Sequence, residues 1–476
     1  MFDVLVIGGG VIGGAILREV KKYNLSACMV EKESDVAMGA SRANSGIVHA
    51  GFDAAVGSLK AKFNVLGNAM MEDYALSLGV KFKRNGSLVV AFDQEELLTL
   101  NDLKERGEKN GVSGLTILTK EQLKEKEPNI SSDALGALYA PTGGIVCPYK
   151  LTIAAIGNAM DNGAKLLCDF EVEKIDNDGE TFIVTAADGR KVVAKVIVNC
   201  AGLYSAKIAN MVGDNSFSVS ARRGEYILLD REQAGFVNST LFFTPTKKGK
   251  GILVSPTVDG NVILGPTAEE VKERQTDTTE SGLKEVIEKA RYMCPNTPLF
   301  STITSFAGAR AYCDRHDFII EESLAVKGFI NCAGIESPGL TAAPAIAKFV
   351  VEELISKRVE LTKNLNFNGN RKADDFFDHL STSEKNEIIK ENPTYGKIVC
   401  RCEKITEGEI VRAIRVNPPA TTVDGVKRRV RAGMGRCQGG FCQPQVVEII
   451  ARERNLAIDS VTKSGKNSYL LKGVTK

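Results

Sequence analysis

Four cysteines near the C-terminal end have the spacing that points most directly to a chemistry. Cys400 and Cys402 form a C-x-C pair, and Cys437 and Cys442 form a C-x4-C pair 34 residues further on. The second pair lies in the stretch GMGRCQGGFC, where small residues let backbone N–H groups approach the sulfurs. This pattern favours a 2Fe–2S cluster. Two alternatives stay open, a structural zinc ion and four unconnected buried cysteines, although zinc ribbons more often use C-x2-C pairs.

Three glycines near the N-terminus, Gly8, Gly10 and Gly13, form the pattern G-x-G-x-x-G. Glycine at these positions allows a tight turn, the close approach of a pyrophosphate and the packing of a helix on a strand. Glu31, 18 residues after Gly13, is placed to accept hydrogen bonds from the ribose hydroxyls of a dinucleotide. The glycines therefore predict an adenine dinucleotide cofactor, which is FAD or NAD.

The segments around these glycines have the order that such a loop needs. Apolar residues predict a buried strand over Asp3–Ile7 and a second over Ser26–Glu31, with a helix from about 11 to 23 between them. A helix that begins at the loop directs its first N–H groups at the phosphates. Residues 191–202 predict a further buried strand, and residues 328–351 predict a strand, a loop and a helix. Both segments fit the same cofactor domain. The expected fold class is α/β, with a Rossmann-like cofactor domain.

The segment after the second strand favours FAD over NAD. Residues 39–51 read GASRANSGIVHAG, and such small residues let the chain run close beside a long, flat ligand. A helix beginning near Leu340 would direct its N-terminus at the flavin and favour the negative charge that develops on the reduced ring. Because no second strand–G-x-G-x-x-G–helix unit occurs, we expect electrons to leave the flavin through the cysteine-bound cluster.

Several motifs, in order along the chain, resemble those of L-2-hydroxyglutarate dehydrogenases and oxidases. They are Glu31-Lys32, NSGIVHAG, GSLKAK at 57–62, RGEY at 223–226 and AGAR at 307–310. These enzymes belong to the FAD-dependent group that includes glycerol-3-phosphate dehydrogenase and D-amino-acid oxidase. The resemblance covers about residues 1–355 and implies a FAD-binding domain interleaved with an antiparallel β substrate domain of α+β type.

A second resemblance covers about residues 397–450. This segment is similar to the small helical 2Fe–2S domain of the bacterioferritin-associated ferredoxin type, in the form found at the C-terminus of the anaerobic glycerol-3-phosphate dehydrogenase large subunit. We therefore expect a FAD-binding domain over 1–80, 145–215 and 300–360, and a substrate domain over 81–144 and 216–299. A linker over 361–396 with one short helix, and a cluster domain with a tail over 397–476, complete the expected organisation.

The glycine loop, the small-residue segments and the first resemblance together give a set of expected cofactor-binding residues. These residues are Gly8, Gly10, Gly13, Glu31, Lys32, Ser41, Ser45, Gly46, Ala201, Gly202, Gly308, Gly334, Gly339, Leu340 and Thr341. The expected cluster ligands are Cys400, Cys402, Cys437 and Cys442.

Oxidising an alcohol at a flavin requires a base for the hydroxyl proton and a cation for an anionic substrate tail. Of three histidines, His49 lies inside the flavin-lining segment and is the expected base. Arg310 and Arg223 are the expected anion-binding residues, because guanidinium binds carboxylate or phosphate bidentately. Arg222 is a rival of Arg223, since neighbours on a strand face opposite sides. Tyr226 is an expected hydrogen-bond donor, with packing as its other possible role.

The two resemblances disagree about the substrate. Glycerol-3-phosphate dehydrogenases carry H-x-G-x-R where this chain has His49-Ala-Gly51-Phe-Asp53, an acid in place of the phosphate-binding cation. Because an aspartate repels a phosphate dianion, we expect a 2-hydroxy acid such as L-2-hydroxyglutarate. Glycerol 3-phosphate is the alternative, with Lys247 or Lys248 as other cations for its phosphate. An amino or imino acid is the third possibility, and a non-catalytic electron-transfer subunit is the alternative from a different class.

Composition limits the partners of this 476-residue chain. A net charge of +2 gives no reason to expect nucleic acid, and no apolar run of 18 residues exists. Residues 397–476 hold 16 lysines and arginines against 7 acids. We expect this excess to compensate an anionic cluster and to dock a partner redox protein or quinone-linked subunit, with a solvated basic face as the other interpretation. The expected location is cytoplasmic, peripheral to a membrane only through a partner subunit.

Overall fold

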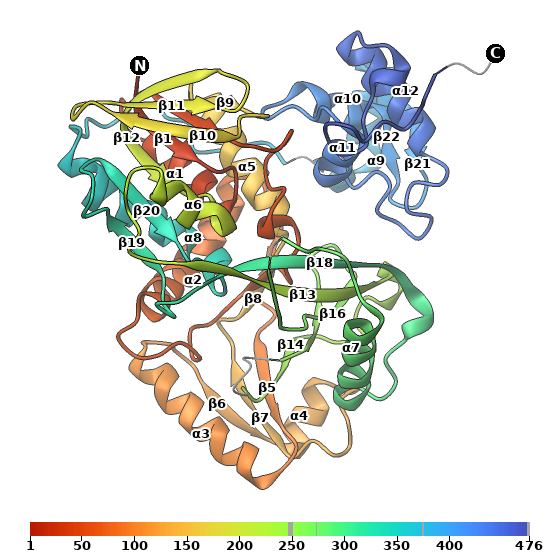
Figure 1. Ribbon diagram of the computed structural model, residues 1–476. Helices are drawn as coiled ribbons and strands as arrows, with labels where there is room; N and C mark the ends of the chain where they lie inside the picture. The colour runs from red at the N-terminus through yellow and green to blue at the C-terminus, as the bar shows by residue number, and fades with distance from the viewer. Residues whose placement is uncertain (246–250, 273, 374–375, 474–476) are drawn as a thin grey trace.

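Two large sheets and a C-terminal helical module make up the chain (Figure 1). The computed structural model describes residues 1–245, 251–272, 274–373 and 376–473. None of the helices in these ranges is both long and apolar enough to cross a bilayer. The glycine loop follows a strand of the first sheet, and residues of the second sheet line the same cavity.

The first sheet has eight strands and contains the strand that leads into the glycine loop. Its order is β10 (Val172–Asn177), β11 (Phe182–Ala186), β12 (Lys191–Asn199), β1 (Phe2–Ile7), β2 (Ala27–Val30) and β9 (Lys165–Leu167), with β20 (Phe329–Ala333) beside β12 and β19 (Ile319–Glu322) beside β20. The pairs β12–β1, β1–β2, β2–β9 and β12–β20 are parallel, and those that involve β10, β11 and β19 with their neighbours are antiparallel. The strands expected from residues 3–7, 26–31, 191–202 and 328–351 thus all lie in one sheet.

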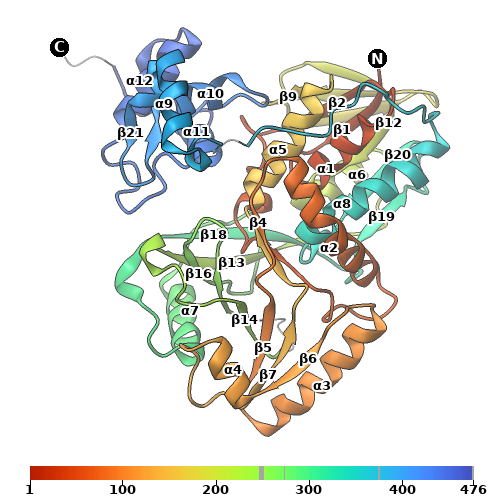
Figure 2. The same ribbon diagram turned by 180° about the vertical axis from the view of Figure 1, so that it is seen from behind.

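Three helices pack side by side on one face of this sheet, as Figure 2 shows. They are α1 (Val11–Val20), α5 (Pro148–Asp161) and α8 (Gly339–Phe349). The helix α2 (Leu59–Ser77) packs on α8, where a Cβ on Gly67 would lie 2.1 Å from the carbonyl oxygen of Thr341. The short helix α6 (Ser205–Asn210) contributes to the core of the other face. The expected helix near Leu340 therefore exists, and its N-terminus lies at the carboxyl end of β20.

The second sheet has nine strands and is mostly antiparallel. Its order is β17 (Glu269–Val271), β13 (Val219–Leu229), β16 (Val262–Gly265), β15 (Leu253–Pro256), β14 (Thr240–Phe243), β5 (Ser87–Ala91), β7 (Gly136–Ala140) and β6 (Thr116–Thr119), with β18 (Thr302–Cys313) along β13. Helices α3 (Gln94–Lys109), α4 (Lys120–Lys126) and α7 (Glu280–Met293) accompany it. A three-stranded sheet of β3 (Ile47–Val48), β8 (Gly144–Val146) and β4 (Phe82–Lys83) joins the two large ones.

One expected domain boundary differs from the structure. The first domain was expected to resume at residue 300, but β18 pairs with β13 from Val219 to Leu229 and so belongs to the second sheet. The chain returns to the first sheet only at β19. The reason is that β13 and β18 are long strands that run beside each other from one sheet region to the other (Figure 1).

The C-terminal module has a hydrophobic core of its own. It contains β21 (Ile398–Cys400), β22 (Ile405–Thr406), α10 (Glu407–Arg415), α11 (Val423–Val430) and α12 (Gln443–Arg454), and α9 (Thr382–Glu391) precedes it. The stretch expected to be a linker runs back over the first domain, because Asn364 N donates to Lys22 O and Arg18 Nη2 donates to Gly369 O. The stretch that precedes α9 is therefore fixed to the first domain by hydrogen bonds.

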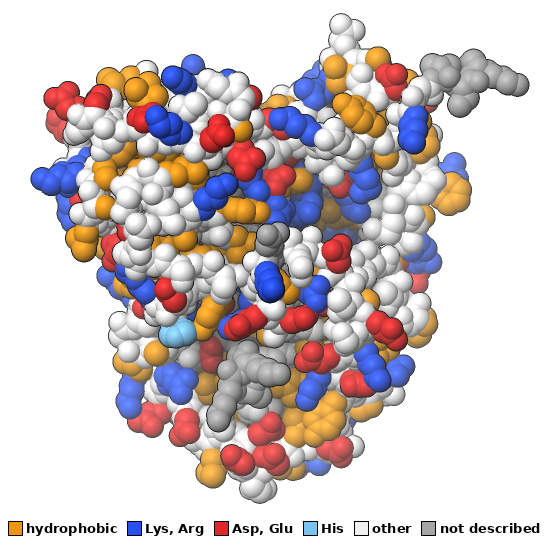
Figure 3. All heavy atoms as spheres, viewed as in Figure 1, with side chains coloured by type: hydrophobic (Ala, Val, Ile, Leu, Met, Phe, Trp, Pro, Cys, Tyr) orange, Lys and Arg blue, Asp and Glu red, His pale blue; other side chains and the backbone are white. Residues whose placement is uncertain are grey.

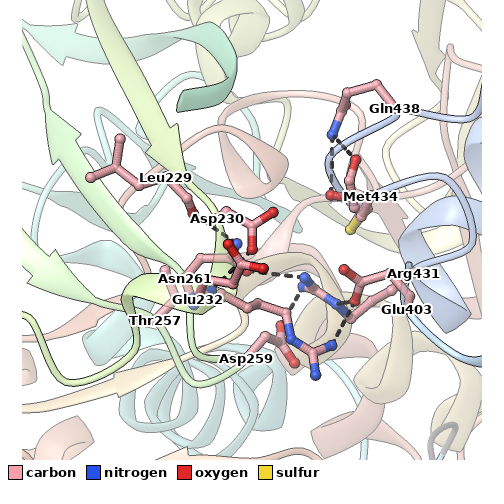
Figure 4. A network of polar contacts seen from close by, with 12 residues as sticks. Leu229, Asp230, Glu232, Thr257, Asp259, Asn261, Glu403, Arg431, Met434 and Gln438 are labelled. Atoms are coloured by element: carbon pink, nitrogen blue, oxygen red, sulfur yellow. Dashed lines mark hydrogen bonds and ion pairs between the residues drawn. The ribbon is translucent and has the colours of Figure 1, made fainter. Parts of the chain in front are cut away.

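Two buried groups of ion pairs fix the module against the body. Asp35 accepts hydrogen bonds from Arg428 and Arg429 of α11, and all three side chains are buried. Arg431 pairs with Asp259 of the second sheet and with Glu403 of the module, at 2.8 Å in both cases (Figure 4). Lysine and arginine side chains gather in the hollow where module and body meet (Figure 3).

Replacing Asp35 with asparagine is expected to loosen this contact. Burial opposes ionisation of Asp35, but Arg429 and Arg428 hold its pKa at about 2, below its ordinary value of 3.8. Leaving two buried guanidinium groups without their carboxylate should lower the free energy of unfolding by about 3–5 kcal/mol. Urea unfolding at pH 7, followed by circular dichroism, measures this difference, and the exposed Asp459 replaced with asparagine is the control.

The same pair of proteins gives a pH test. A carboxylate with a lowered pKa stabilises the folded state above its ordinary pKa, and that contribution is lost as the pH falls through the folded pKa. The difference in stability between wild type and Asp35→Asn should therefore shrink from about pH 5 to pH 2. A difference that stays constant over this range would contradict an ionised Asp35 in the contact.

Candidate active site and cluster site

A cavity of about 780 Å³ is lined by residues of both large sheets. At one end lie the glycine loop and the residues after β2, and at the other lie β13, β18 and α7. The cavity wall includes both expected cofactor residues and expected catalytic residues. Of the expected cofactor residues, those that line it are Gly8, Gly10, Glu31, Lys32, Ser41, Ser45, Ala201, Gly202, Gly308, Gly339 and Leu340.

The glycine loop has the close contacts that its sequence predicts. Gly8 has a φ of +111°, and a Cβ there would lie 2.4 Å from the carbonyl oxygen of Cys200. A Cβ on Gly13 would lie 2.1 Å from the carbonyl oxygen of Gly8, so only glycine lets α1 approach β1. Ser41 Oγ accepts a hydrogen bond from Val11 N at the start of α1. The loop is therefore held open in the form that receives a pyrophosphate.

Glu31 lies at the end of β2 and lines the cavity. Its carboxylate accepts hydrogen bonds from Gly9 N at 2.7 Å and from Glu33 N at 2.9 Å. Burial raises its pKa, and the two N–H groups act in the opposite direction. Glu31 thus stabilises the glycine loop through Gly9 N. Its contact with a ribose stays a prediction.

Four expected cofactor residues lie behind the cavity wall. These are Gly13, Gly46, Gly334 and Thr341, which are absent from the lining. Gly46 has a φ of +68°, and a Cβ there would lie 2.5 Å from Val146 O, while Gly334 has a φ of +62° and lies against Cys313. The three glycines shape the wall from behind, since each allows a close approach of chain segments, and Thr341 Oγ1 accepts a hydrogen bond from His49 N.

Two arginines that sequence reasoning missed line the cofactor end of the cavity. Arg274 pairs with Glu33 and also donates to the carbonyl oxygen of Met38. Burial lowers the pKa of Arg42, and the nearby Arg428 and Arg274 act in the same direction. No ion pair of Arg42 occurs in the part of the chain that the structure describes. A cation beside the loop fits a diphosphate, and the only sequence signal for Arg42 was its place inside residues 39–51.

His49 lies on the cavity wall and is held by its backbone. Its N–H donates to Thr341 Oγ1 at 2.9 Å, and its carbonyl oxygen accepts from Asn64 Nδ2 at 3.1 Å and Asn68 Nδ2 at 3.0 Å. The ring atom Nε2 lies 3.2 Å from Ser337 Oγ. The first turn of α8 and the helix α2 thus fix the position of His49. Sequence reasoning missed Ser337, which also lines the cavity.

Arg310 and Tyr226 reach the cavity from β18 and β13. Arg310 Nη2 donates to the carbonyl oxygen of Thr267 at 2.7 Å, while its Nε is buried without a hydrogen-bond partner. Burial raises the pKa of Tyr226, so its phenol stays protonated, although the nearby Arg310 acts in the opposite direction. An unsatisfied buried guanidinium N–H in a cavity wall is a feature that an anionic ligand would relieve.

The structure does not bring Arg223 to this cavity. Its guanidinium pairs with Glu269 at 2.5 Å and with Glu225 at 3.4 Å, and it donates to the carbonyl oxygen of Asp277. Its neighbour Arg222 lines the cavity instead, because cross-strand register places Arg222 opposite Arg310. The expected role of Arg223 as an anion-binding residue is therefore corrected, and Arg222 takes its place as the candidate.

Other charged residues surround the substrate end of the cavity. Lys60 lines it and donates to Glu336 Oε1 at 3.1 Å, and Lys289 and Asp53 line it as well. Lys247 and Lys248, the other cations considered for a phosphate, lie outside the described residues. Asp53 is thus one acid in a wall that also presents Arg310, Lys60 and Lys289.

The four C-terminal cysteines approach one another in two pairs. Cys402 Sγ and Cys437 Sγ lie 3.7 Å apart, and the Cys442 thiol hydrogen-bonds to Cys400. That bond, helped by the N–H groups of Gly433 and Glu403, lowers the pKa of Cys400 to about 6. No three histidine, cysteine or carboxylate side chains of the described ranges converge on the position of one metal ion. Two thiol pairs fit a two-iron cluster, in which each iron takes two cysteines.

The residues around these sulfurs also fit a cluster. Burial opposes ionisation of Cys437, but the N–H groups of Gly439, Phe441 and Gly440 approach its sulfur and lower its pKa. A Cβ on Gly435 would lie 2.3 Å from Cys402 Cβ, so the loop can close on Cys402 only with glycine there. Backbone N–H groups that converge on sulfur stabilise the thiolate that binds iron.

The fold and the two sites define a flavin-dependent oxidoreductase with an attached iron–sulfur module. Residues 3–353 match the family model described as FAD dependent oxidoreductase, and residues 398–452 match that of the BFD-like [2Fe-2S] binding domain. The chain belongs to the FAD-dependent oxidoreductase family, and its cofactors are FAD and a 2Fe–2S cluster. The family resemblances found in the sequence, the fold class and both cofactors are thereby confirmed.

Three relatives bear on the reaction. The chain is 51% identical over its whole length to the glycerol 3-phosphate dehydrogenase of Caloramator mitchellensis, covering 99% of that protein. It is 34% identical to the mitochondrial L-2-hydroxyglutarate dehydrogenase of Bos taurus over 56% of this chain and 61% of that protein. The dithionite-reduced L-alpha-glycerophosphate oxidase of Mycoplasma pneumoniae, solved with FAD bound, has a TM-score of 0.74 at 31% identity and covers 78% of this chain and 98% of its own.

Proposed function

We propose that this chain is a glycerol-3-phosphate dehydrogenase that passes electrons through its 2Fe–2S cluster to a partner redox protein. The observation that carries the proposal is the likeness to a glycerol 3-phosphate dehydrogenase at 51% identity, because it includes both the flavin part and the cluster module. The L-2-hydroxyglutarate dehydrogenase match leaves out a large part of each chain. The comparisons thus favour the alternative that the sequence analysis held open over its first choice of a 2-hydroxy acid.

Asp53 does not exclude a phosphorylated substrate. Asp53 is half-buried in the cavity wall, and its carbonyl oxygen accepts a hydrogen bond from Arg106. Arg310 offers a buried N–H without a partner in the same cavity. Because the same wall also presents Arg310, Lys60 and Lys289, an acid at position 53 is compatible with a phosphorylated substrate.

A few residues of the cavity wall carry the separate tasks of the reaction. Bound FAD supplies the acceptor for the hydride that leaves the substrate carbon. His49 takes the hydroxyl proton at Nε2, and Ser337 orients the ring through its 3.2 Å contact. Arg310 binds the phosphate, and Tyr226 donates a hydrogen bond to the substrate from the neighbouring strand. With its phosphate at Arg310, the substrate would present its hydroxyl group to His49.

Steady-state turnover tests this proposal. Holoprotein with an artificial acceptor is supplied in turn with sn-glycerol 3-phosphate, L-2-hydroxyglutarate, other 2-hydroxy acids and amino acids. We expect glycerol 3-phosphate to be consumed and dihydroxyacetone phosphate to form in equal amount. Turnover of amino acids alone would reassign the substrate, and no turnover with any compound would favour a non-catalytic electron-transfer subunit.

Replacing Arg310 with lysine should weaken substrate binding while FAD stays bound. Lysine offers one point charge in place of the planar guanidinium, so a bidentate phosphate contact is lost. With hydrogen bonds to charged groups contributing about 1.5–3 kcal/mol each, kcat/KM should fall by about 10- to 100-fold, mostly through KM. Arg315→Lys, an exposed arginine just beyond β18, is the matched control and should not change kcat/KM. If both variants have the same kcat/KM, Arg310 does not bind the substrate.

A further inference from the structure

The solvent-facing edge of the cluster site carries both an apolar and a cationic group. We propose that this edge, made of Arg401, Cys402, Lys404 and Phe441 and called here the cluster rim, is the docking surface for an acidic one-electron carrier protein. The inference rests on the proposed function only in that electrons leave through the cluster. It adds where the partner binds and which charge the partner presents.

Exposure distinguishes the rim from the rest of the cluster site. Cys402 is exposed, whereas Cys400 and Cys442 are buried. Phe441, which directly precedes Cys442, has 85% of its side chain exposed. A large aromatic side chain gains from burial, and aromatic residues are enriched at protein contacts. Phe441 therefore offers an apolar anchor beside the point where the cluster comes nearest to solvent.

Charge distinguishes the rim from the other basic surfaces of the module. Arg428, Arg429, Arg431 and Arg436 pair with acids of the flavin-binding body, so the body itself uses much of the positive excess. Arg401 and Lys404 flank Cys402 and are exposed. Neither has an ion pair within the described ranges. Two unpaired cations beside a redox centre favour a partner with an acidic surface.

The rim and the body-facing side of the cluster loop are separate. Tyr149 Oη of the body contacts Met434 Sδ at 3.5 Å, and Met434 stands between Gly433 and Gly435, which contact Cys400 and Cys402. The flavin-binding body meets the cluster region at Met434, at Arg436, which pairs with Glu232, and at the buried Glu403, which pairs with Arg231. The four rim side chains are exposed instead. A carrier can therefore dock at the rim without displacing the module.

The stoichiometry follows from the chemistry of the two ends. Oxidation of one alcohol to a ketone releases two electrons and two protons. A 2Fe–2S cluster passes electrons one at a time, so two carrier molecules are each reduced by one electron for every substrate oxidised. The protons go to solvent.

The test uses two haem proteins of opposite charge as probes, the acidic haem domain of cytochrome b5 and the basic cytochrome c. Holoprotein is first reduced with dithionite, freed of the reductant and mixed with each probe, and haem absorbance reports the transfer rate. We expect rapid reduction of cytochrome b5 that slows as salt rises. The double variant Arg401→Glu with Lys404→Glu should be at least about 10-fold slower with cytochrome b5 and faster with cytochrome c. Phe441→Ala should slow cytochrome b5 without changing the salt dependence.

Controls separate the rim from general charge and from the cluster itself. Arg454→Glu with Lys472→Glu changes the net charge of the module equally at two exposed sites away from the cysteines, and should leave both rates unchanged. The visible spectrum of the cluster and the rate of transfer to menadione, a small neutral acceptor, should be the same in all variants. Because dithionite replaces the substrate, the outcome does not depend on whether glycerol 3-phosphate is oxidised.

Three results would overturn the proposal. They are an unchanged cytochrome b5 rate in the rim variant, an equal loss in the control variant, and a slower reduction of cytochrome b5 than of cytochrome c at low salt. Flotation with vesicles of anionic phosphatidylglycerol is a further arm. Binding that the rim variant loses would assign the rim to a membrane surface instead of a carrier protein.

Discussion

Replacing His49 with asparagine is expected to slow flavin reduction by glycerol 3-phosphate by about 100- to 10,000-fold, the range for losing a general base. The backbone contacts of His49 with Thr341, Asn64 and Asn68 do not involve its ring, so asparagine should keep the local fold. Anaerobic stopped-flow spectroscopy of the flavin band measures the reduction rate. The FAD content of the variant should equal that of the wild type.

Two further observations make this prediction specific to the ring of His49. His316→Asn is the matched control, because His316 contacts Tyr312 and does not line the cavity. Its rate should equal that of the wild type. If His49→Asn reduces its flavin within about three-fold of the wild-type rate, another group takes the proton and His49 only shapes the wall.

Replacing Cys437 with alanine is expected to remove the cluster and stop electron delivery to a protein acceptor. The wild type should contain about two iron atoms and two acid-labile sulfides per chain, and the variant close to none. Transfer from the reduced protein to cytochrome b5 should fall by more than about 100-fold, because no other one-electron centre belongs to the proposed route. Reduction of the flavin by substrate should persist, since Cys437 lies in the module and not in the cavity wall.

A second cysteine serves as the control for this variant. Cys168 directly follows β9 and is half-buried. It lies far from the four cluster cysteines in the sequence. Cys168→Ala should keep iron, sulfide and transfer rate. Zinc in the wild type in place of iron, or iron retained in Cys437→Ala, would contradict the assignment of the four thiols to a 2Fe–2S cluster.

Local patterns were enough to predict the cofactor end of the molecule. Gly8 and Gly13 are required by contacts a few ångströms away, so their spacing alone predicts the turn and the approach of α1 to β1. The cysteine pairs are equally local. Arg274 was missed because its place beside the glycine loop depends on how a distant segment folds over it. Arg42 lies within residues 39–51, but no local pattern distinguishes it there.

The alternation of side chains along a strand distinguishes Arg222 from Arg223 in the sequence itself. Residues two apart on a strand share a face, so Arg222 and Tyr226 point the same way and Arg223 points the other. Tyr226 and Arg223 therefore cannot both face one cavity. The antiparallel register, with Arg222 opposite Arg310, confirms that alternation.

Counting lysines and arginines could not show which groups the positive charges of the module contact. Its main partners, Asp35 and Asp259, lie 394 and 172 residues before Arg429 and Arg431, and only the tertiary structure brings them together. Substrate choice was beyond the sequence for a similar reason. It depends on the sum of charges around a cavity wall built from many segments, and Asp53 is one contribution among several.

Oxidation of glycerol 3-phosphate is the activity proposed for this flavoprotein. The most direct measurement is anaerobic flavin bleaching in the holoprotein, with sn-glycerol 3-phosphate and L-2-hydroxyglutarate compared over the same concentration range. We expect saturable bleaching by glycerol 3-phosphate, with kcat/KM at least about 100-fold above that for L-2-hydroxyglutarate, a difference of about 2.7 kcal/mol. Bleaching by L-2-hydroxyglutarate and none by glycerol 3-phosphate would contradict the proposed activity.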